Sequence, residues 1–143
     1  MQEMFKSIAD LLKTCLEADP KIKAKVIAVY LFGSYATGLA KESSDIDLAF
    51  LLEEKCYRLD PFESSSGAHL VAARMALALD AEIDVTVLNG ASTEMAYEVV
   101  TTGICLYDAD SDRRFDYEAK VRGMYFDFKP FLDILRKQYV DGL

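Results

Sequence analysis

The chain has 143 residues, a length that predicts one domain over residues 1–143 with enough sequence to bury a core. Hydrophobic residues make up 52% and charged residues 28%, which are proportions of a folded chain rather than a disordered one. The net charge of −8 argues against direct nucleic-acid binding, because phosphate contacts need lysine and arginine, and it favours a basic protein partner.

The cysteines and the hydropathy pattern indicate a cytoplasmic protein. Cys15, Cys56 and Cys105 are odd in number and match no metal-ligand spacing, so we expect buried, reduced thiols. No apolar run approaches the length of a membrane span, and charged residues interrupt every apolar stretch near the N-terminus. We therefore expect neither a signal peptide nor a membrane partner.

The first predicted elements are a helix and a buried strand. Apolar residues recur at helical spacing over residues 1–18, and Asp19-Pro20 is expected to end this helix because a residue before proline avoids the α region. Residues 21–25 are expected to form a basic surface linker. Residues 26–32 are apolar without alternation, as in a central strand covered on both faces.

A small-residue corner and a pair of carboxylates follow that strand. Gly33 and Ser34 precede a predicted helical turn, where backbone N–H groups and the serine hydroxyl favour an anion. The next strand, residues 45–52, starts with Asp45 and Asp47, whose Cα atoms lie roughly 6.5 Å apart on one face. Neighbouring carboxylates need protons or a cation, and Mg²⁺ prefers oxygen ligands. A metal-bound nucleotide triphosphate satisfies both halves.

A third carboxylate follows in the next predicted strand. Residues 56–66 are expected to form a loop and residues 69–79 a helix, with His69 on its surface. Asp84 lies inside the strand predicted over residues 81–89. If this strand lies beside residues 45–52, Asp84 completes a three-carboxylate cluster suited to two bridged cations. The alternative is that Asp84 faces solvent on an edge strand.

The C-terminal part is predicted to contain a helix over residues 93–101 capped by Ser92, a short strand over residues 104–107 and one long helix. A stripe of apolar side chains on the long helix is expected to be core; it consists of Tyr117, Val121, Met124, Phe128, Phe131, Leu135 and Tyr139. Pro130 is expected to kink this helix. On the opposite side, Phe126 is either an isolated apolar residue or part of a protein interface with Ile134 and Val140.

The order of elements predicts an α/β (α+β) fold, a small mixed sheet of about four strands flanked by helices, with a long C-terminal helix. Gly33-Ser34, a ten-residue interval and Asp45-Ile46-Asp47 resemble the signature of the DNA polymerase β-like nucleotidyltransferases. Over about residues 24–143 the chain is similar to the minimal nucleotidyltransferase (MNT) antitoxins of HEPN/MNT toxin–antitoxin systems.

That resemblance implies a function and a set of site residues. Asp45, Asp47 and Asp84 would be catalytic and would bind two Mg²⁺ ions, and Gly33 and Ser34 would bind the nucleotide. The implied reaction transfers AMP from ATP-Mg to a tyrosine hydroxyl of a partner HEPN ribonuclease, which the antitoxin silences and binds.

One position departs from the family pattern. Thr37 stands where many relatives carry arginine, and Lys41 or Arg74 is expected to supply the missing charge. Two other functions remain open: a non-catalytic antitoxin that acts by steric sequestration, and a small-molecule nucleotidyltransferase of the aminoglycoside-inactivating type.

Overall fold

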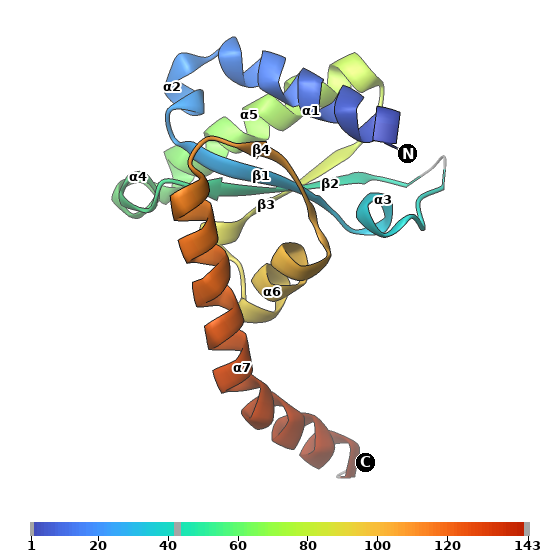
Figure 1. Ribbon diagram of the computed structural model, residues 1–143, viewed down its shortest axis with the longest axis vertical. Coiled ribbons are helices and arrows are strands. Elements are labelled where there is room, and N and C mark those ends of the chain that lie inside the picture. Colours follow the sequence, from blue (N-terminus) through green and yellow to red (C-terminus); the bar gives the residue numbers. More distant parts are fainter. Residues whose placement is uncertain (1, 42–43, 142–143) are drawn as a thin grey trace.

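The computed structural model describes residues 2–41 and 44–141. Its elements, in chain order, are α1 (Gln2–Glu17), α2 (Pro20–Lys23), β1 (Val26–Phe32), α3 (Ser34–Thr37), β2 (Ile46–Leu52), α4 (Glu54–Leu59), α5 (Pro61–Leu79), β3 (Ile83–Val87), the 3-10 helix η1 (Leu88–Gly90), α6 (Thr93–Thr102), β4 (Ile104–Asp108) and α7 (Ser111–Asp141) (Figure 1). No helix in the described ranges combines the length and apolar character needed to cross a membrane.

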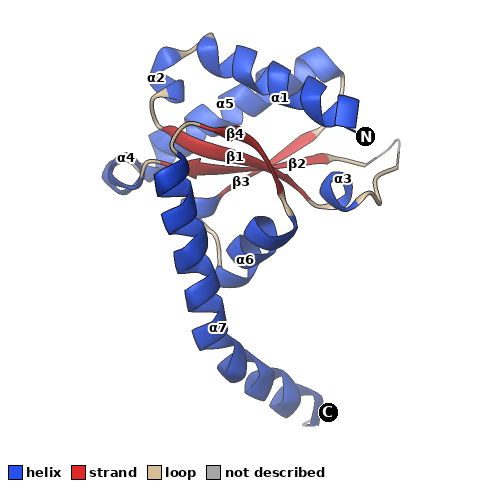
Figure 2. Cartoon of the chain, in the orientation of Figure 1, coloured by secondary structure: helices blue, strands red, loops and turns tan. Residues whose placement is uncertain are grey.

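The four strands form one mixed sheet in the order β3-β2-β1-β4 (Figure 2), which confirms the predicted fold class. β1 pairs antiparallel with both β2 and β4, whereas β2 and β3 are parallel. The two central strands, β1 and β2, are buried along almost their whole length, as their unbroken apolar sequences predict.

Helices cover both faces of the sheet, and alternate residues of β1 separate the two cores. Val29 and Leu31 face the core beneath α1 and α5. Ala28, Tyr30 and Phe32 face the second core, which α6 and the first turns of α7 complete. Helices thus pack against both faces of β1 and β2. This packing positions the ends of the two strands, where the predicted site residues lie.

Two segments that we expected to be irregular are helical. The linker prediction for residues 21–25 is wrong for residues 21–23, which belong to α2, whereas residues 24 and 25 form a turn. α2 forms because the Asp19 carboxylate accepts a hydrogen bond from the Ile22 N–H at 3.3 Å and Pro20 occupies the first helical position. The loop prediction for residues 56–66 is also wrong, since these residues belong to α4 and α5.

Side-chain caps explain the second error. The Glu53 carboxylate accepts from the Cys56 N–H at 2.7 Å and starts α4. Asp60 ends α4 and caps α5 by accepting from the Glu63 N–H at 3.0 Å. Two serines in this segment also donate hydrogen bonds to helix carbonyls, Ser64 to Cys56 at 3.1 Å and Ser66 to Phe62 at 2.7 Å. The side-chain caps at the N-termini of α4 and α5 thus outweigh the low helix propensity of the serines at positions 64–66.

β3 is shorter at both ends than the strand predicted over residues 81–89, and at its C-terminal end it gives way to η1, which contains Asn89. The Asn89 side chain accepts from the Leu52 N–H and donates to the Leu52 carbonyl, each at 2.9 Å. This amide replaces the backbone partner that a longer β3 would have offered, and the chain turns into η1. The prediction that Ser92 caps α6 is confirmed, since its hydroxyl accepts from the Met95 N–H at 3.1 Å.

The N-terminal turns of α7 are tied to the sheet through a buried polar network. The Tyr30 hydroxyl donates to Glu118 at 2.9 Å, and Arg114 contacts Glu118 at 3.2 Å and Asp108 at 2.9 Å. Burial, followed by the hydrogen bond to Glu118, raises the pKa of Tyr30, so this phenol stays a donor. The network joins β1, β4 and α7 and runs from the buried Tyr30 and Glu118, through the partly buried Arg114, to the exposed Asp108.

Replacing Arg114 by Met is expected to lower the free energy of unfolding by about 2–4 kcal/mol, because the variant leaves the buried Glu118 without its cation. Urea denaturation followed by circular dichroism measures this loss. Arg113→Met is the matched control, since the Arg113 side chain is 57% exposed and its pairs with Glu53 and Asp110 are longer. Equal stability of both variants would contradict the assigned role of Arg114.

The apolar stripe of α7 is buried only at its start. Val121 is buried, but Met124, Phe128, Phe131, Leu135 and Tyr139 are 46–72% exposed, so the prediction that the whole stripe is core is wrong. We call these five exposed residues the α7 stripe. The reason is geometric: α6 is the last element beside α7, and the C-terminal half of α7, which contains Pro130, curves beyond it (Figure 1). Phe126, Ile134 and Val140 are exposed as well.

The cysteines are free thiols, as expected. Cys15 is buried, whereas Cys56 and Cys105 are only partly buried, so the prediction of burial holds fully for one of the three. His69 lies on the exposed side of α5, in agreement with a surface role.

Candidate active site

The corner between β1 and α3 depends on Gly33. Gly33 has φ +72° and ψ −149°, a conformation that side chains disfavour. Its carbonyl accepts hydrogen bonds from the N–H groups of Ala36 and Thr37 at 3.1 and 3.2 Å, which closes the predicted helical turn. A Cβ atom on Gly33 would collide with Oδ2 of Asp47. The corner therefore lies directly against this carboxylate.

The sheet register brings the predicted carboxylates to the same edge. Asp47 in β2 pairs with Phe32 in β1 on one side and with Asp84 in β3 on the other. Asp45 precedes Asp47 by two residues, and the intervening Ile46 N–H donates to the Glu82 carbonyl at 3.0 Å. Asp84 thus lies beside the Asp-x-Asp pair, as expected. It also belongs to an edge strand and is exposed to solvent, so both features that the sequence offered as alternatives are present together.

The other two carboxylates lie close enough to Asp47 to affect its ionisation. The pKa of Asp47 is raised from its ordinary value by burial first, and then by the negative charges of Asp84 and Asp45. Asp45 and Asp84 are themselves exposed. The partly buried carboxylate of Asp47 is thus flanked by two accessible ones, an arrangement that a cation would stabilise.

The donor set fits a hard cation such as Mg²⁺, because every predicted ligand is a carboxylate oxygen. Among residues 2–41 and 44–141, however, no three His, Cys, Asp or Glu side chains already converge as ligands of one metal ion. The metal-binding role of Asp45, Asp47 and Asp84 therefore stays a prediction, supported by their shared edge and mutual repulsion.

The structure distinguishes between Lys41 and Arg74 as replacements for the arginine that is missing at Thr37. Arg74 lies 3.9 Å from Asp19, which precedes β1, whereas the Gly33 corner follows β1, roughly 20 Å away along the strand. Lys41 lies in the loop before Asp45, in a turn closed by hydrogen bonds from its N–H to the Ser44 hydroxyl at 2.8 Å and from the Ser44 N–H to its carbonyl at 2.9 Å. Lys41 is thus the better placed of the two.

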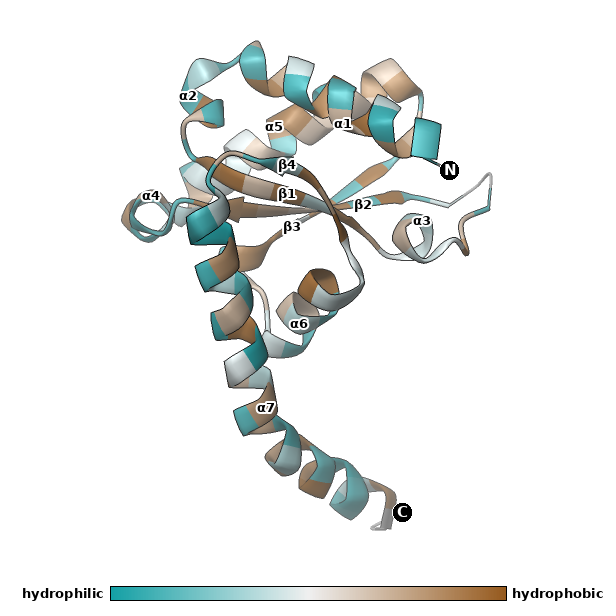
Figure 3. Ribbon diagram, viewed as in Figure 1, coloured by the Kyte–Doolittle hydropathy of each residue, from teal (hydrophilic) through white to brown (hydrophobic). Residues whose placement is uncertain are grey.

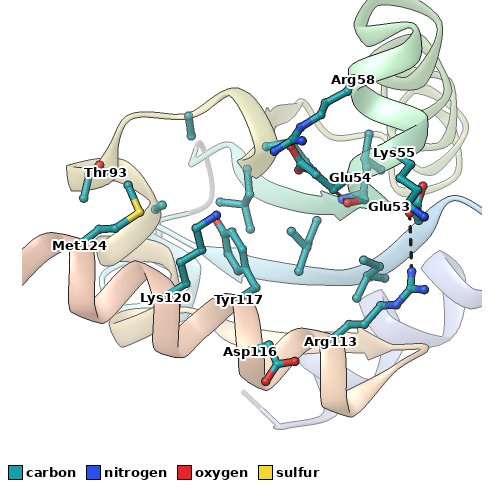
Figure 4. A pocket seen from close by; sticks show the side chains of 17 residues that line it. Glu53, Glu54, Lys55, Arg58, Thr93, Arg113, Asp116, Tyr117, Lys120 and Met124 are labelled. Atoms are coloured by element: carbon teal, nitrogen blue, oxygen red, sulfur yellow. Dashed lines mark hydrogen bonds and ion pairs between the residues drawn. The ribbon is translucent and has the colours of Figure 1, made fainter.

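Sequence reasoning missed a cavity of about 630 Å³ at the other end of β2 (Figure 4). It lies between η1, α4, α6 and α7, and none of the five predicted site residues lines it. Its wall includes Leu52, Lys55, Tyr117, Lys120 and Met124. Burial, and then the charge of Glu54, raise the pKa of Tyr117 to about 12. No motif marks these residues, because they come from separate elements.

Comparison of the sequence with known proteins identifies the family of this chain. The model of the polymerase beta nucleotidyltransferase family matches residues 12–112, a range that contains both the Gly33 corner and all three carboxylates. The chain belongs to the polymerase beta nucleotidyltransferase family. It is also 34% identical over 101 residues to a protein adenylyltransferase, MntA, of Shewanella oneidensis, covering 71% of this chain and 67% of that protein.

Solved structures resemble nearly the whole chain. A chain of a toxin–antitoxin crystal structure with AMP-PNP aligns with a TM-score of 0.66 and 28% identity, over 94% of this chain and 96% of that one. A chain from the tri-AMPylated Shewanella oneidensis HEPN toxin in complex with MNT antitoxin aligns with a TM-score of 0.60 and 28% identity, over 99% and 98%. The similarity at 99% coverage extends over α7 as well as the sheet.

Proposed function

We propose that this chain, acting as one domain over residues 1–143, is an antitoxin that transfers AMP from ATP to a tyrosine hydroxyl of a partner HEPN-type ribonuclease toxin. The observation that carries the proposal is the position of Asp47, between Asp45 and Asp84 and against the Gly33 corner. The related protein adenylyltransferase and the AMPylated toxin complex name the same chemistry for similar chains.

In the proposed reaction, Gly33 and Ser34 hold the β- and γ-phosphates through backbone N–H groups and the serine hydroxyl. Asp45 and Asp47 would hold one Mg²⁺ ion beside the triphosphate, and Asp84 would help to hold the second. When bound, two Mg²⁺ ions would lower the pKa of the acceptor hydroxyl and offset the charge on the leaving pyrophosphate. Rotation of the exposed Asp45 and Asp84 side chains toward Asp47 would form the ligand shell.

The bond changes balance without a further reactant. Asp84 takes the proton of the acceptor hydroxyl, whose oxygen attacks the α-phosphorus in line. The bond from the α-phosphorus to the bridging oxygen breaks, and pyrophosphate leaves with its electron pair. The chain contributes mainly positioning and fixed charge, as is usual in phosphoryl and nucleotidyl transfer.

The intact mass of the toxin after incubation with the chain and Mg²⁺-ATP tests this function. We expect a gain of one or more AMP units, and we expect ribonuclease activity to fall in parallel. Full neutralisation without ATP, with no change in mass, would identify a sequestering antitoxin instead. Transfer of labelled AMP to an aminoglycoside, but not to the toxin, would identify the small-molecule alternative.

A further inference from the structure

The α7 stripe leaves an unusual amount of apolar surface uncovered. Its five residues, Met124, Phe128, Phe131, Leu135 and Tyr139, are 49%, 46%, 54%, 46% and 72% exposed. Figure 3 shows hydrophobic residues recurring along the C-terminal half of α7, which extends away from the sheet. Three aromatic side chains and two large aliphatic ones on one helix face exceed the scattered apolar residues that are normal on a monomer.

The spacing of these residues indicates what kind of element would cover them. From Tyr117 the apolar positions advance by four, three, four, three and four residues to Leu135. This alternation is the seam of a helix that packs lengthwise against another helix. The first two positions, Tyr117 and Val121, pack in the core formed with α6 and β1. The later positions continue the same seam with no covering element in the described ranges.

The α7 stripe is continuous with the cavity. Met124 belongs to both, and Tyr117 and Lys120 line the cavity on the same side of α7 (Figure 4). The cavity lining combines apolar residues, such as Leu51, Leu88 and Ala96, with charged residues of both signs, among them Lys120 and Asp116. An exposed apolar helix face that ends at a cavity suits a second helix with one projecting anchor side chain.

Contacts with α6 keep the stripe facing outward. Tyr125 stacks on Tyr97 of α6 with ring centroids 3.7 Å apart, and Arg136 pairs with Glu94 of α6 at 2.6 Å. These contacts use the side of α7 next to the stripe. These contacts hold α7 against α6 by one side, and the apolar side chains of the α7 stripe stay accessible on another side.

We propose that the α7 stripe and the adjoining cavity form the docking surface for an apolar helix of the partner toxin. This inference rests on the proposed function. A second copy of the chain fits less well, because pairing would bring together two bodies that each carry a net charge of −8. A basic ribonuclease would instead be attracted. The resembling chain of the HEPN toxin–MNT antitoxin complex, which matches α7 as well, is itself partnered by a toxin.

The test is the affinity of the full chain for the toxin after Phe128→Ser and Phe131→Ser are combined. These two rings lie 5.7 Å apart at the centre of the stripe. Both rings would be buried in the complex, so their loss is expected to weaken toxin binding at least about 30-fold, as measured by titration calorimetry without ATP. Phe62→Ser is the matched control: Phe62 is 84% exposed on α5, away from the stripe, and its loss should leave the affinity unchanged.

Further measurements separate the outcomes. Thermal unfolding of the double variant should match that of the unchanged chain, because both side chains already face solvent. Unchanged toxin affinity of the double variant would overturn the inference, as would a wild-type dimer, seen by light scattering, that the double variant converts to a monomer. A chain that binds the toxin through the stripe yet transfers no AMP would leave the docking surface standing and refute the proposed catalysis.

Discussion

Replacing Asp47 by Asn is expected to abolish AMP transfer, with a loss of at least about 10³-fold, while the fold remains intact. Asp47 is the carboxylate that the Gly33 corner touches and that Asp45 and Asp84 flank. An amide at this position removes the negative charge that would hold a cation beside the triphosphate. Transfer of labelled AMP to the toxin, measured under single-turnover conditions, gives the loss.

The same substitution is expected to maintain or raise the melting temperature in the absence of metal. The folded pKa of Asp47 is raised above the ordinary value of 3.8, so its ionised form costs stability at neutral pH, and this cost disappears as pH falls through the folded pKa. Asn carries no such cost. Magnesium should therefore stabilise the unchanged chain but not the variant. Asp10→Asn, at an exposed position on α1, is the control; full transfer by the Asp47 variant would contradict the mechanism.

Gly33→Ala is expected to reduce transfer by about two orders of magnitude and to cost about 1–3 kcal/mol of stability. An alanine at position 33 would have to adopt a φ of +72°, which residues with a side chain disfavour. Its Cβ atom would also push against the Asp47 carboxylate. The change thus displaces the anion corner and the central carboxylate together. Transfer rates and urea denaturation measure the two effects separately.

Gly123→Ala provides the matched control for that substitution. Gly123 lies within α7, and a Cβ built there meets nothing within 4 Å. Alanine should leave transfer unchanged and stabilise the helix slightly. If Gly33→Ala behaved like Gly123→Ala, the corner would not be positioned by close contact with Asp47.

The sequence predicts the site region well because local signals agree there. Two unbroken apolar strands bracket Gly33 and Ser34, and the two-residue period of a strand places Asp45 and Asp47 on one face. That Asp84 lies beside them depends on the pairing of β2 with β3, which no local pattern specifies. The prediction was conditional on this pairing, and the register of Asp47 with Asp84 fulfils the condition.

The C-terminal helix shows where sequence reasoning reaches its limit. Periodicity identifies the apolar side of α7 but carries no information about what covers it, so the stripe was interpreted as core. The cavity was missed for a related reason, since Tyr117 and Lys55 are brought together only by tertiary packing. The helices α2, α4 and α5 begin where Asp19, Glu53 and Asp60 cap them, and a cap of this kind is a weaker local signal than hydrophobic periodicity.

A crystal structure of the chain with Mn²⁺ and a non-hydrolysable ATP analogue tests the central claim most directly. We expect anomalous density between Asp45, Asp47 and Asp84, with the triphosphate against Gly33 and Ser34. A nucleotide bound instead in the cavity beside Tyr117 and Lys120, with no metal at the three carboxylates, would contradict the account.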